Sequence, residues 1–335
     1  MPDCNRNQLN NNVGCFTILV VVLAIIPAVA VHNKEHQAQS GAMRPENLER
    51  ESPLEDRIGS APDSFLKQFD GEPGVKVSPH VVTTAERMVV AMALSDLTSV
   101  QRGVLRERLH SIYFIDGLPN NALTYPDDDK AAEPVYNIAV RAGVLDESIS
   151  ELVTRKEQTL FDTTGSDISV NVDAGNLDAI VYVLLHEATH IVDASLGVTR
   201  DVKAATALSP LVNNVWSDSL TPVEQYRQPL LMKVRYRHDG HVLPISKAPD
   251  VYDALGLTPF ISVYGSTNWH DDLAELVAWT QLTGCLHQPY RISIRKGTKV
   301  IRTIEPEKSN LVHGRLKYLA QLSGTQADSR VCGQP

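Results

Sequence analysis

The feature that most constrains the fold of this chain is the apolar run LDAIVYVLLHEATHIVDA, which spans Leu177–Ala194. Its length and composition are typical of a buried helix, and Asn176 precedes it as a helix-start signal. Polar side chains are costly to bury without partners, yet this run contains two histidines and a glutamate. The fold must therefore provide groups that bind these three side chains.

The spacing of these residues, His186-Glu187-x-x-His190, indicates a metal site. Residues four apart share one face of a helix, so both imidazoles can bind a single ion, for which we expect Zn²⁺. Glu187 can then take a proton from water at an open coordination position. The alternative is that both histidines are satisfied by hydrogen bonds within an ordinary core.

The third ligand is expected in Ser262–Trp279, because a catalytic zinc site usually has three protein ligands and one water. From His270 onward this segment has the pattern of an amphipathic helix, on which Asp271 and Glu275 lie one turn apart on the same face. One carboxylate can bind the metal, and the other can accept the N–H of a ligating histidine. The pattern leaves this choice open, and His270 is a further alternative.

The run Tyr264-Gly265-Ser266-Thr267-Asn268, followed by Asp271 and Glu275, resembles the segment that closes the zinc site in gluzincin-like HExxH peptidases. The likeness is to the catalytic domain of anthrax lethal factor and related secreted enzymes. It implies that Tyr264 binds the oxyanion, that Asp271 is the third ligand, and that Glu275 holds a ligand histidine. Aspartate stands here in place of the family's glutamate, so Asp271 must lie closer to the metal or leave the role to Glu275.

The resemblance covers Leu177–Ala194 and Ser262–Thr280, and it implies an exported zinc metallopeptidase that acts on a peptide or protein substrate. Glu187 would be the general base for attack of water on the peptide carbonyl. The alternative is a non-catalytic zinc-binding or interaction domain. Structural zinc sites usually have four protein ligands, often cysteines, and no cysteine lies near the motif, which favours the enzyme.

The hydrophobic pattern predicts an α+β fold in which a small mixed sheet packs on the motif helix, as in a zincin-like domain. Ile168–Val172 is the candidate for an exposed edge strand near the site, where a peptide could add as a further strand; an interior strand is the alternative. The other predicted helices are Ala85–Leu94, Val100–Leu109, a surface helix at Glu147–Phe161, and Leu311–Leu322. The other predicted strands are Ser111–Leu118, Val135–Val140, and hairpins at Met232–Leu243 and Tyr290–Ile304.

The N-terminal residues predict export. Residues 16–31 are apolar, short for a membrane span, and end in Ala28-Val29-Ala30, so we expect a cleaved signal over residues 1–30 and a secreted or periplasmic product. An uncleaved membrane anchor is the alternative. Residues 31–80 are expected to be a polar linker or a pro-segment, 81–325 the zincin-like catalytic domain, and 326–335 a polar tail.

The charge and the cysteine content of the chain limit which binding partners we expect. The net charge is −9 and the basic residues are scattered, so nucleic acid is not expected as a partner. Membrane contact is expected only through the N-terminal segment. Cys285 and Cys332 are the two cysteines of the mature chain, and one disulfide between them would suit an oxidising compartment.

Overall fold

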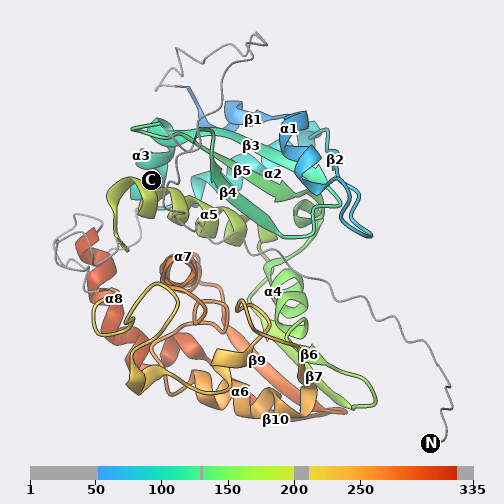
Figure 1. Cartoon of the computed structure of the whole chain (residues 1–335), viewed down its shortest axis with the longest axis vertical. Coiled ribbons are helices and arrows are strands. Elements are labelled where there is room, and N and C mark those ends of the chain that lie inside the picture. The colour runs from blue at the N-terminus through green and yellow to red at the C-terminus, as the bar shows by residue number, and fades with distance from the viewer. Residues whose placement is uncertain (1–51, 129–130, 200–210, 323–335) are drawn as a thin grey trace, which may run out of the picture. The chain divides into compact units, whose positions relative to one another are not determined.

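The computed structural model describes residues 52–128, 131–199 and 211–322, which form an α+β fold (Figure 1). The α+β class expected from the sequence is confirmed. The helices are α1 (Asp63–Leu66), α2 (Thr84–Ser95), α3 (Ser99–Arg108), α4 (Ile149–Gln158), α5 (Ala179–Leu196), α6 (Ala248–Leu255), α7 (Trp269–Thr280) and α8 (Asn310–Leu322). The strands are β1 (Ile58–Gly59), β2 (Ser78–Pro79), β3 (Leu109–Asp116), β4 (Ala122–Pro126), β5 (Tyr136–Arg141), β6 (Phe161–Asp162), β7 (Ile168–Asp173), β8 (Leu243–Pro244), β9 (Arg291–Lys296) and β10 (Lys299–Ile304).

These strands form one larger mixed sheet and two smaller sheets. The larger sheet has the order β1-β3-β5-β4, and β2 pairs with β3 outside this path. β3 runs parallel to β1 and β5, whereas β4 runs antiparallel to β5 and lies at the edge. The smaller sheets have the orders β10-β9-β7 and β6-β8. The edge strand β4 lies against the motif helix α5 (Figure 1).

Both faces of the larger sheet are buried, because successive side chains of β3 and β5 point to opposite sides. Ile112, Phe114, Ile138 and Val140 belong to the main core cluster, which also contains the buried residues of α2, α3 and α5. Tyr113, Ile115 and Ala139 belong to a second cluster with Phe65 of α1. The sheet is therefore packed between the helical core and the N-terminal segment.

The motif helix α5 is a core helix, as its apolar sequence predicts. It ends at Gly197, whose φ of 65° is the left-handed conformation that glycine adopts easily at a helix C-terminus. The buried side chain of Gln101 on α3 donates to Leu185 O at 2.7 Å and to Thr189 Oγ1 at 2.9 Å. Among the described residues α5 alone is long and apolar enough to cross a membrane, but 78% of that window is buried within the protein.

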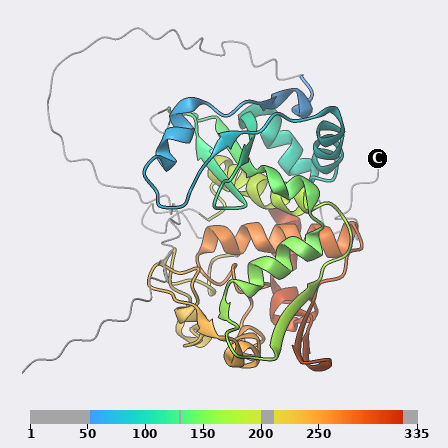
Figure 2. The same ribbon diagram turned by 90° about the vertical axis from the view of Figure 1, so that its right-hand side faces the viewer.

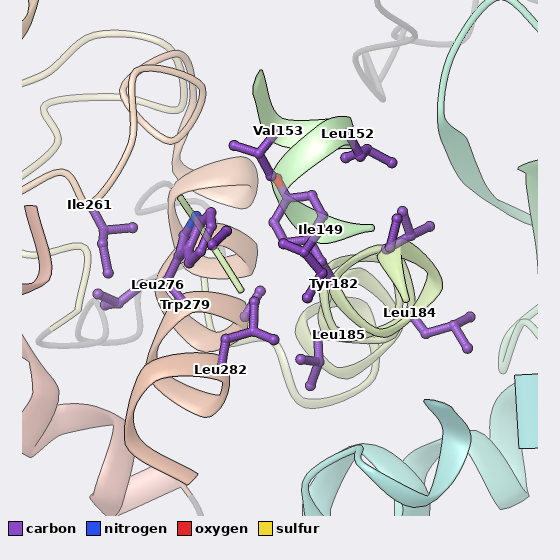
Figure 3. Close-up of a cluster of buried hydrophobic side chains, with 14 of the residues drawn as sticks. Ile149, Leu152, Val153, Tyr182, Leu184, Leu185, Ile261, Leu276, Trp279 and Leu282 are labelled. Carbon is purple, nitrogen blue, oxygen red and sulfur yellow. The ribbon is translucent and has the colours of Figure 1, made fainter. Parts of the chain in front are cut away.

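Helices α4, α5 and α7 pack around a common apolar centre (Figure 3). Figure 2 shows α4 beside α7, although 110 residues lie between the end of α4 at Gln158 and the start of α7 at Trp269. Trp279 of α7 stacks on Tyr290 with ring centroids 3.6 Å apart. The side chains that meet here are Ile149, Leu152, Val153, Tyr182, Leu185, Leu276 and Leu282. The predicted surface helix at Glu147–Phe161 is confirmed as α4, which buries Ile149, Leu152 and Val153 on one face and exposes Glu151 and Arg155 on the other.

One expected hairpin is wrong and another is confirmed. Met232–Leu243 contains a 3-10 turn and an isolated parallel bridge between Val234 and His241, and β8 pairs with β6 instead. The alternating basic residues of this segment suggest a solvent-exposed strand face. Arg237 instead turns inward and donates to the carbonyl oxygens of Leu231 and Leu220. The C-terminal hairpin is formed by β9 and β10 as predicted.

The expected exposed edge at Ile168–Val172 is also wrong. The corresponding strand, β7, does lie at the edge of its sheet, but α4 covers the backbone that faces away from β9. Thr154 Oγ1 accepts from Val172 N at 2.9 Å, and Gln158 Nε2 donates to Val170 O at 3.0 Å. A peptide therefore has no free edge to join at β7.

The expected linker is folded from Leu54 onward. Arg57 is buried and donates to Leu105 O at 2.7 Å and to Arg106 O at 2.7 Å, so it binds the last turn of α3. Phe65 stacks on Tyr125 of β4 with ring centroids 4.9 Å apart. Residues 1–51 and 323–335, with the expected signal, the tail and Cys332, lie outside the described residues. Cys285 is disulfide-bonded, and its pairing with Cys332 stays a prediction.

We predict that Phe65→Ala lowers the free energy of unfolding by about 3–5 kcal/mol, the usual cost of removing a buried phenylalanine side chain. Urea denaturation of the purified chain measures this difference. The control is Lys67→Ala in the same segment, where the exposed side chain leaves stability within about 0.5 kcal/mol. Equal stability of the two variants would mean that this segment does not pack on the sheet.

Candidate metal centre

Three predicted ligand residues meet at one point. His186 and His190 project from α5, and their Nε2 atoms lie 3.1 Å apart. Asp271, in the first turn of α7, places Oδ1 3.5 Å from each of these nitrogens. His186 and Asp271 are buried, and His190 is partly exposed. Among the described residues this is a group of His, Cys, Asp or Glu side chains that could hold a metal ion.

The triangle of donor atoms has the size that a small cation requires. Ligand atoms at 2.0–2.2 Å from a tetrahedral zinc ion lie about 3.4 Å from one another. The three sides of the triangle measure 3.1, 3.5 and 3.5 Å. Two imidazoles and a carboxylate also form a donor set that suits zinc and several other divalent transition metals. The residues present therefore fit a single ion of this class.

Asn268 orients Asp271 toward the histidines. It caps α7, since its Oδ1 accepts from His270 N at 3.0 Å and from Asp271 N at 2.9 Å. Its Nδ2 donates to Asp271 Oδ2 at 2.6 Å, which leaves Oδ1 facing the two imidazoles. Because α5 and α7 are in direct contact, an aspartate is long enough to reach this point. The structure thus brings Asp271, rather than Glu275, to the Nε2 atoms.

Glu275 lies behind the group, on the far side of His186. Its Oε1 is 3.1 Å from His186 Nδ1, a close charge contact whose angle is not that of a formed hydrogen bond. It accepts from Tyr182 Oη at 2.5 Å, from Lys156 Nζ at 3.2 Å and from Trp279 Nε1 at 3.1 Å. Burial alone would raise the pKa of Glu275, but the charge of Lys156 together with the interactions of His186 and Tyr182 outweighs it and lowers that pKa. Glu275 is therefore charged and suited to fix the ring of His186.

The two imidazoles titrate in opposite directions. Burial lowers the pKa of His186, but Asp271 and Glu275 outweigh it and raise that pKa to about 9. Burial and the nearby His186 lower the pKa of His190. Without an ion the pair thus carries one positive charge, on His186, which lies between Asp271 and Glu275. A metal ion would replace this positive charge and require both imidazoles to be neutral.

Glu187 lies beside the group and is held by the edge strand. Thr124 of β4 donates through Oγ1 to Glu187 Oε2 at 2.6 Å. Glu187 is buried, and this hydrogen bond occupies one carboxylate oxygen, so the other remains available as an acceptor. β4 was not predicted from the sequence, so the contact between Thr124 and Glu187 was not expected.

Tyr264 lies on the turn before α7, with its ring centroid 5.7 Å from that of His186. The turn fits closely against α7, because a Cβ added at Gly265 would lie 3.3 Å from Glu275 Cβ. Burial, together with the charges of Asp271 and Glu187, raises the pKa of Tyr264 well above its usual value. The phenol therefore keeps its proton and can donate it in a hydrogen bond.

His270 and Asp193 form a separate pair. His270 Nδ1 lies 2.7 Å from Asp193 Oδ2, and the His270 side chain is 47% exposed. Asp193 also accepts from Thr199 N at 2.7 Å, so it ties the residues after α5 to the start of α7. Neither residue belongs to the group formed by His186, His190 and Asp271, so the structure favours Asp271 over His270 as the third ligand.

Sequence analysis missed Thr124, Lys156, Tyr182 and Asn268. Only two of them carry a local signal. Tyr182 precedes His186 by four residues and thus shares its helix face, and Asn268 is a favoured N-cap residue before α7. Thr124 and Lys156 come from β4 and α4, and their places depend on how these elements pack.

We predict that Asp271→Asn weakens zinc binding more than Glu275→Gln does, because only Asp271 faces both Nε2 atoms. The Glu275 variant should lose about 10–100-fold in affinity, as is usual for a group that orients a ligand. Competition with a chromophoric chelator at pH 7 measures both dissociation constants. The reverse order would assign the third ligand to Glu275.

Glu157, next to Lys156, is a buried carboxyl of a different kind. Tyr252 Oη donates to its Oε2 at 2.5 Å. Burial raises the pKa of Glu157 to about 7, although the bond from Tyr252 opposes the shift. Between pH 4.5 and about 7, the folded protein thus keeps a proton on Glu157 that the unfolded chain, in which this carboxyl has its ordinary pKa of 4.5, has released. Stability is therefore lost as the pH rises through this interval.

We predict that Glu157→Gln gains stability relative to wild type by roughly 3 kcal/mol between pH 4.5 and 8, because it cannot ionise. Urea denaturation at pH values across this range measures the difference, with the exposed Glu107→Gln on α3 as control. If the Glu157→Gln and wild-type curves run parallel, burial does not shift this carboxyl.

Comparison of the chain with protein-family models, with curated proteins and with solved structures gives no match. No relative therefore supplies a family or an activity. The structure itself establishes an α+β fold and a group of side chains that could hold a metal ion. The function has to be inferred from the site residues.

Proposed function

We propose that this chain is an exported zinc metallopeptidase with a zincin-like, gluzincin-type catalytic domain. The observation that carries the proposal is the convergence of His186, His190 and Asp271, with separations that suit one tetrahedral ion. The two histidines come from an HExxH helix, and the carboxylate comes from a second helix packed against it. The exported location is proposed from residues 1–31 of the sequence alone.

The group favours a catalytic site over a structural one. Among the described residues no fourth His, Cys, Asp or Glu joins the three ligands. Structural zinc sites fill all four positions with protein ligands, whereas catalytic sites leave one position for water. The partly exposed edge of His190 also indicates that the group is reached from solvent.

The side chains around the group have complementary roles. A bound zinc ion would act as a Lewis acid, which lowers the pKa of the attacking water and stabilises the negative charge that develops on the carbonyl oxygen. Glu187, held through Oε2 by Thr124, would accept the proton of the attacking water and deliver it to the leaving amine. Tyr264, which keeps its phenol proton, would donate a hydrogen bond to the developing oxyanion.

Strand β4 offers the free sheet edge that the sequence assigned to Ile168–Val172. Arg141 N donates to Asn121 O, and Asp127 N donates to Val135 O, so residues 121 and 127 face β5. The alternation of an antiparallel ladder then turns the N–H and C=O groups of Ala122 and Thr124 away from the sheet. An extended peptide could pair with them next to Glu187, which supports a peptide as the substrate.

We predict that Glu187→Gln retains zinc but loses peptide hydrolysis by about 10²–10⁴-fold, because glutamine cannot accept the proton. Cleavage of a peptide library by the purified chain, followed by mass spectrometry, measures the activity. Zinc content measured on the same samples separates loss of the base from loss of the metal.

The matched control is Glu151→Gln on α4, an exposed helix-capping glutamate outside the site, and it should leave cleavage unchanged. Equal cleavage by Glu187→Gln and wild type would exclude this mechanism. A wild-type chain that binds zinc and cleaves no peptide would instead favour the non-catalytic zinc-binding domain.

A further inference from the structure

Lys156 of α4 brings a positive charge into the candidate site. Its side chain is 13% exposed. The ammonium donates to Tyr182 Oη at 2.7 Å and to Glu275 Oε1 at 3.2 Å. The same nitrogen lies 3.8 Å from the centroid of the Tyr264 ring. Three groups from three different elements therefore meet at one cation.

The backbone of Lys156 is also linked to the Tyr264 ring, through the side chain of Tyr236. Tyr236 Oη donates to the carbonyl oxygen of Lys156 at 2.5 Å. The Tyr236 ring meets the Tyr264 ring edge-on, with centroids 5.2 Å apart and planes at 86°. One residue of α4 thus supplies a cation at the Tyr264 ring and anchors a second ring against it.

Tyr264 depends on these contacts for its position. Within the part of the chain that the structure describes, its hydroxyl has no hydrogen-bond partner. The ring is held by Lys156, Tyr236 and the more distant ring of His186. A free hydroxyl at the end of a fixed ring is the arrangement that a hydrogen-bond donor to substrate requires.

We propose that Lys156 is a positioning residue, which holds the phenol of Tyr264 in place beside the ligand residue His186. This inference rests on the proposed function, since it assigns a task to Tyr264 in that reaction. The ammonium attracts the negative face of the ring, and Glu275 and Tyr182 keep the ammonium from moving. A displacement of a catalytic group by about 1 Å can cost 10²-fold in rate, so a fixed ring matters to catalysis.

A competing role for Lys156 is to neutralise Glu275 and so to support the ligand His186. The two roles predict different results. Loss of support for His186 weakens zinc binding, as Glu275→Gln does. Loss of the Tyr264 position lowers kcat, leaves zinc affinity at or above the wild-type level, and has no further effect once the phenol is removed.

The test compares Lys156→Met, Lys156→Arg, Tyr264→Phe and the double variant Lys156→Met/Tyr264→Phe. We expect Lys156→Met to lower kcat at least tenfold with little change in KM, because the phenol acts in the transition state. Lys156→Arg keeps a cation at the ring and should recover kcat to within about threefold of wild type. The double variant should match Tyr264→Phe. An additive double variant, or weaker zinc binding in Lys156→Met, would overturn the inference.

A matched control and a second readout separate this inference from the proposed function. Lys317 also lies over a tyrosine ring, 4.8 Å from the centroid of Tyr318, but on α8 away from the ligand group, so Lys317→Met should leave kcat unchanged. In chain labelled with 3-fluorotyrosine, the ¹⁹F resonance of Tyr264 is the one that Tyr264→Phe removes.

This resonance should shift in Lys156→Met and stay in place in Lys317→Met, whether or not the protein cleaves peptides. If the wild-type chain has no peptidase activity but the resonance still shifts in Lys156→Met, the proposed function is refuted and the placement of the ring by Lys156 is supported. An unshifted resonance would overturn the inference and leave the peptidase proposal intact.

Discussion

A buried imidazole, a partly exposed one and three buried carboxylates meet where α5 packs on α7, and the arrangement of the site depends on how these charges are compensated. An ionised group in an apolar core is destabilising unless an opposite charge or a hydrogen bond meets it. His186 lies between Asp271 and Glu275, and Glu187 binds Thr124. The pairing of these two helices is therefore an electrostatic requirement as well as a hydrophobic one, and it leaves at their contact a triangle of donor atoms that could hold a metal ion.

Further charges extend this compensation beyond the ligand group. Lys156 balances Glu275 on one side of α7. On the other side, Asp272 is buried against Arg315 of α8, with oxygen–nitrogen distances of 2.8 and 2.6 Å. These two neighbouring aspartates thus have different partners. Asp271 faces the two histidines, and Asp272 attaches the C-terminal helix α8 to α7. These two ion pairs, Lys156 with Glu275 and Arg315 with Asp272, attach α7 to α4 and to α8.

The larger sheet places the other half of the site. Its edge strand β4 holds Glu187 through Thr124 on one face, and on the opposite face Tyr125 stacks on Phe65 of the N-terminal segment. Folding of Leu54–Pro79 onto the sheet therefore supports the strand that contacts the proposed general base. A segment with the composition of a linker contributes to the site because it covers apolar side chains that would otherwise face water.

The sequence by itself determined the parts of the protein that local rules control. Helical periodicity located α5, α7 and the shared face of His186 and His190, and capping and turn residues located most other helices and the C-terminal hairpin. The helical pattern left both Asp271 and Glu275 open as the third ligand, because both lie on one face of α7, and the resemblance to gluzincin-like peptidases favoured Asp271. The packing of α7 on α5, with Asn268 as the cap of Asp271, brings Asp271 to the two imidazoles.

Contacts between distant segments decided the rest. Lys156 and Glu275 are 119 residues apart, and Thr124 and Glu187 are 63 apart. No periodicity links such residues, since their approach is set by the packing of whole elements. For the same reason β7 has the pattern of an exposed edge, although the side chains of α4 occupy its backbone groups. Local pattern indicates what an element can be, and tertiary structure decides what it touches.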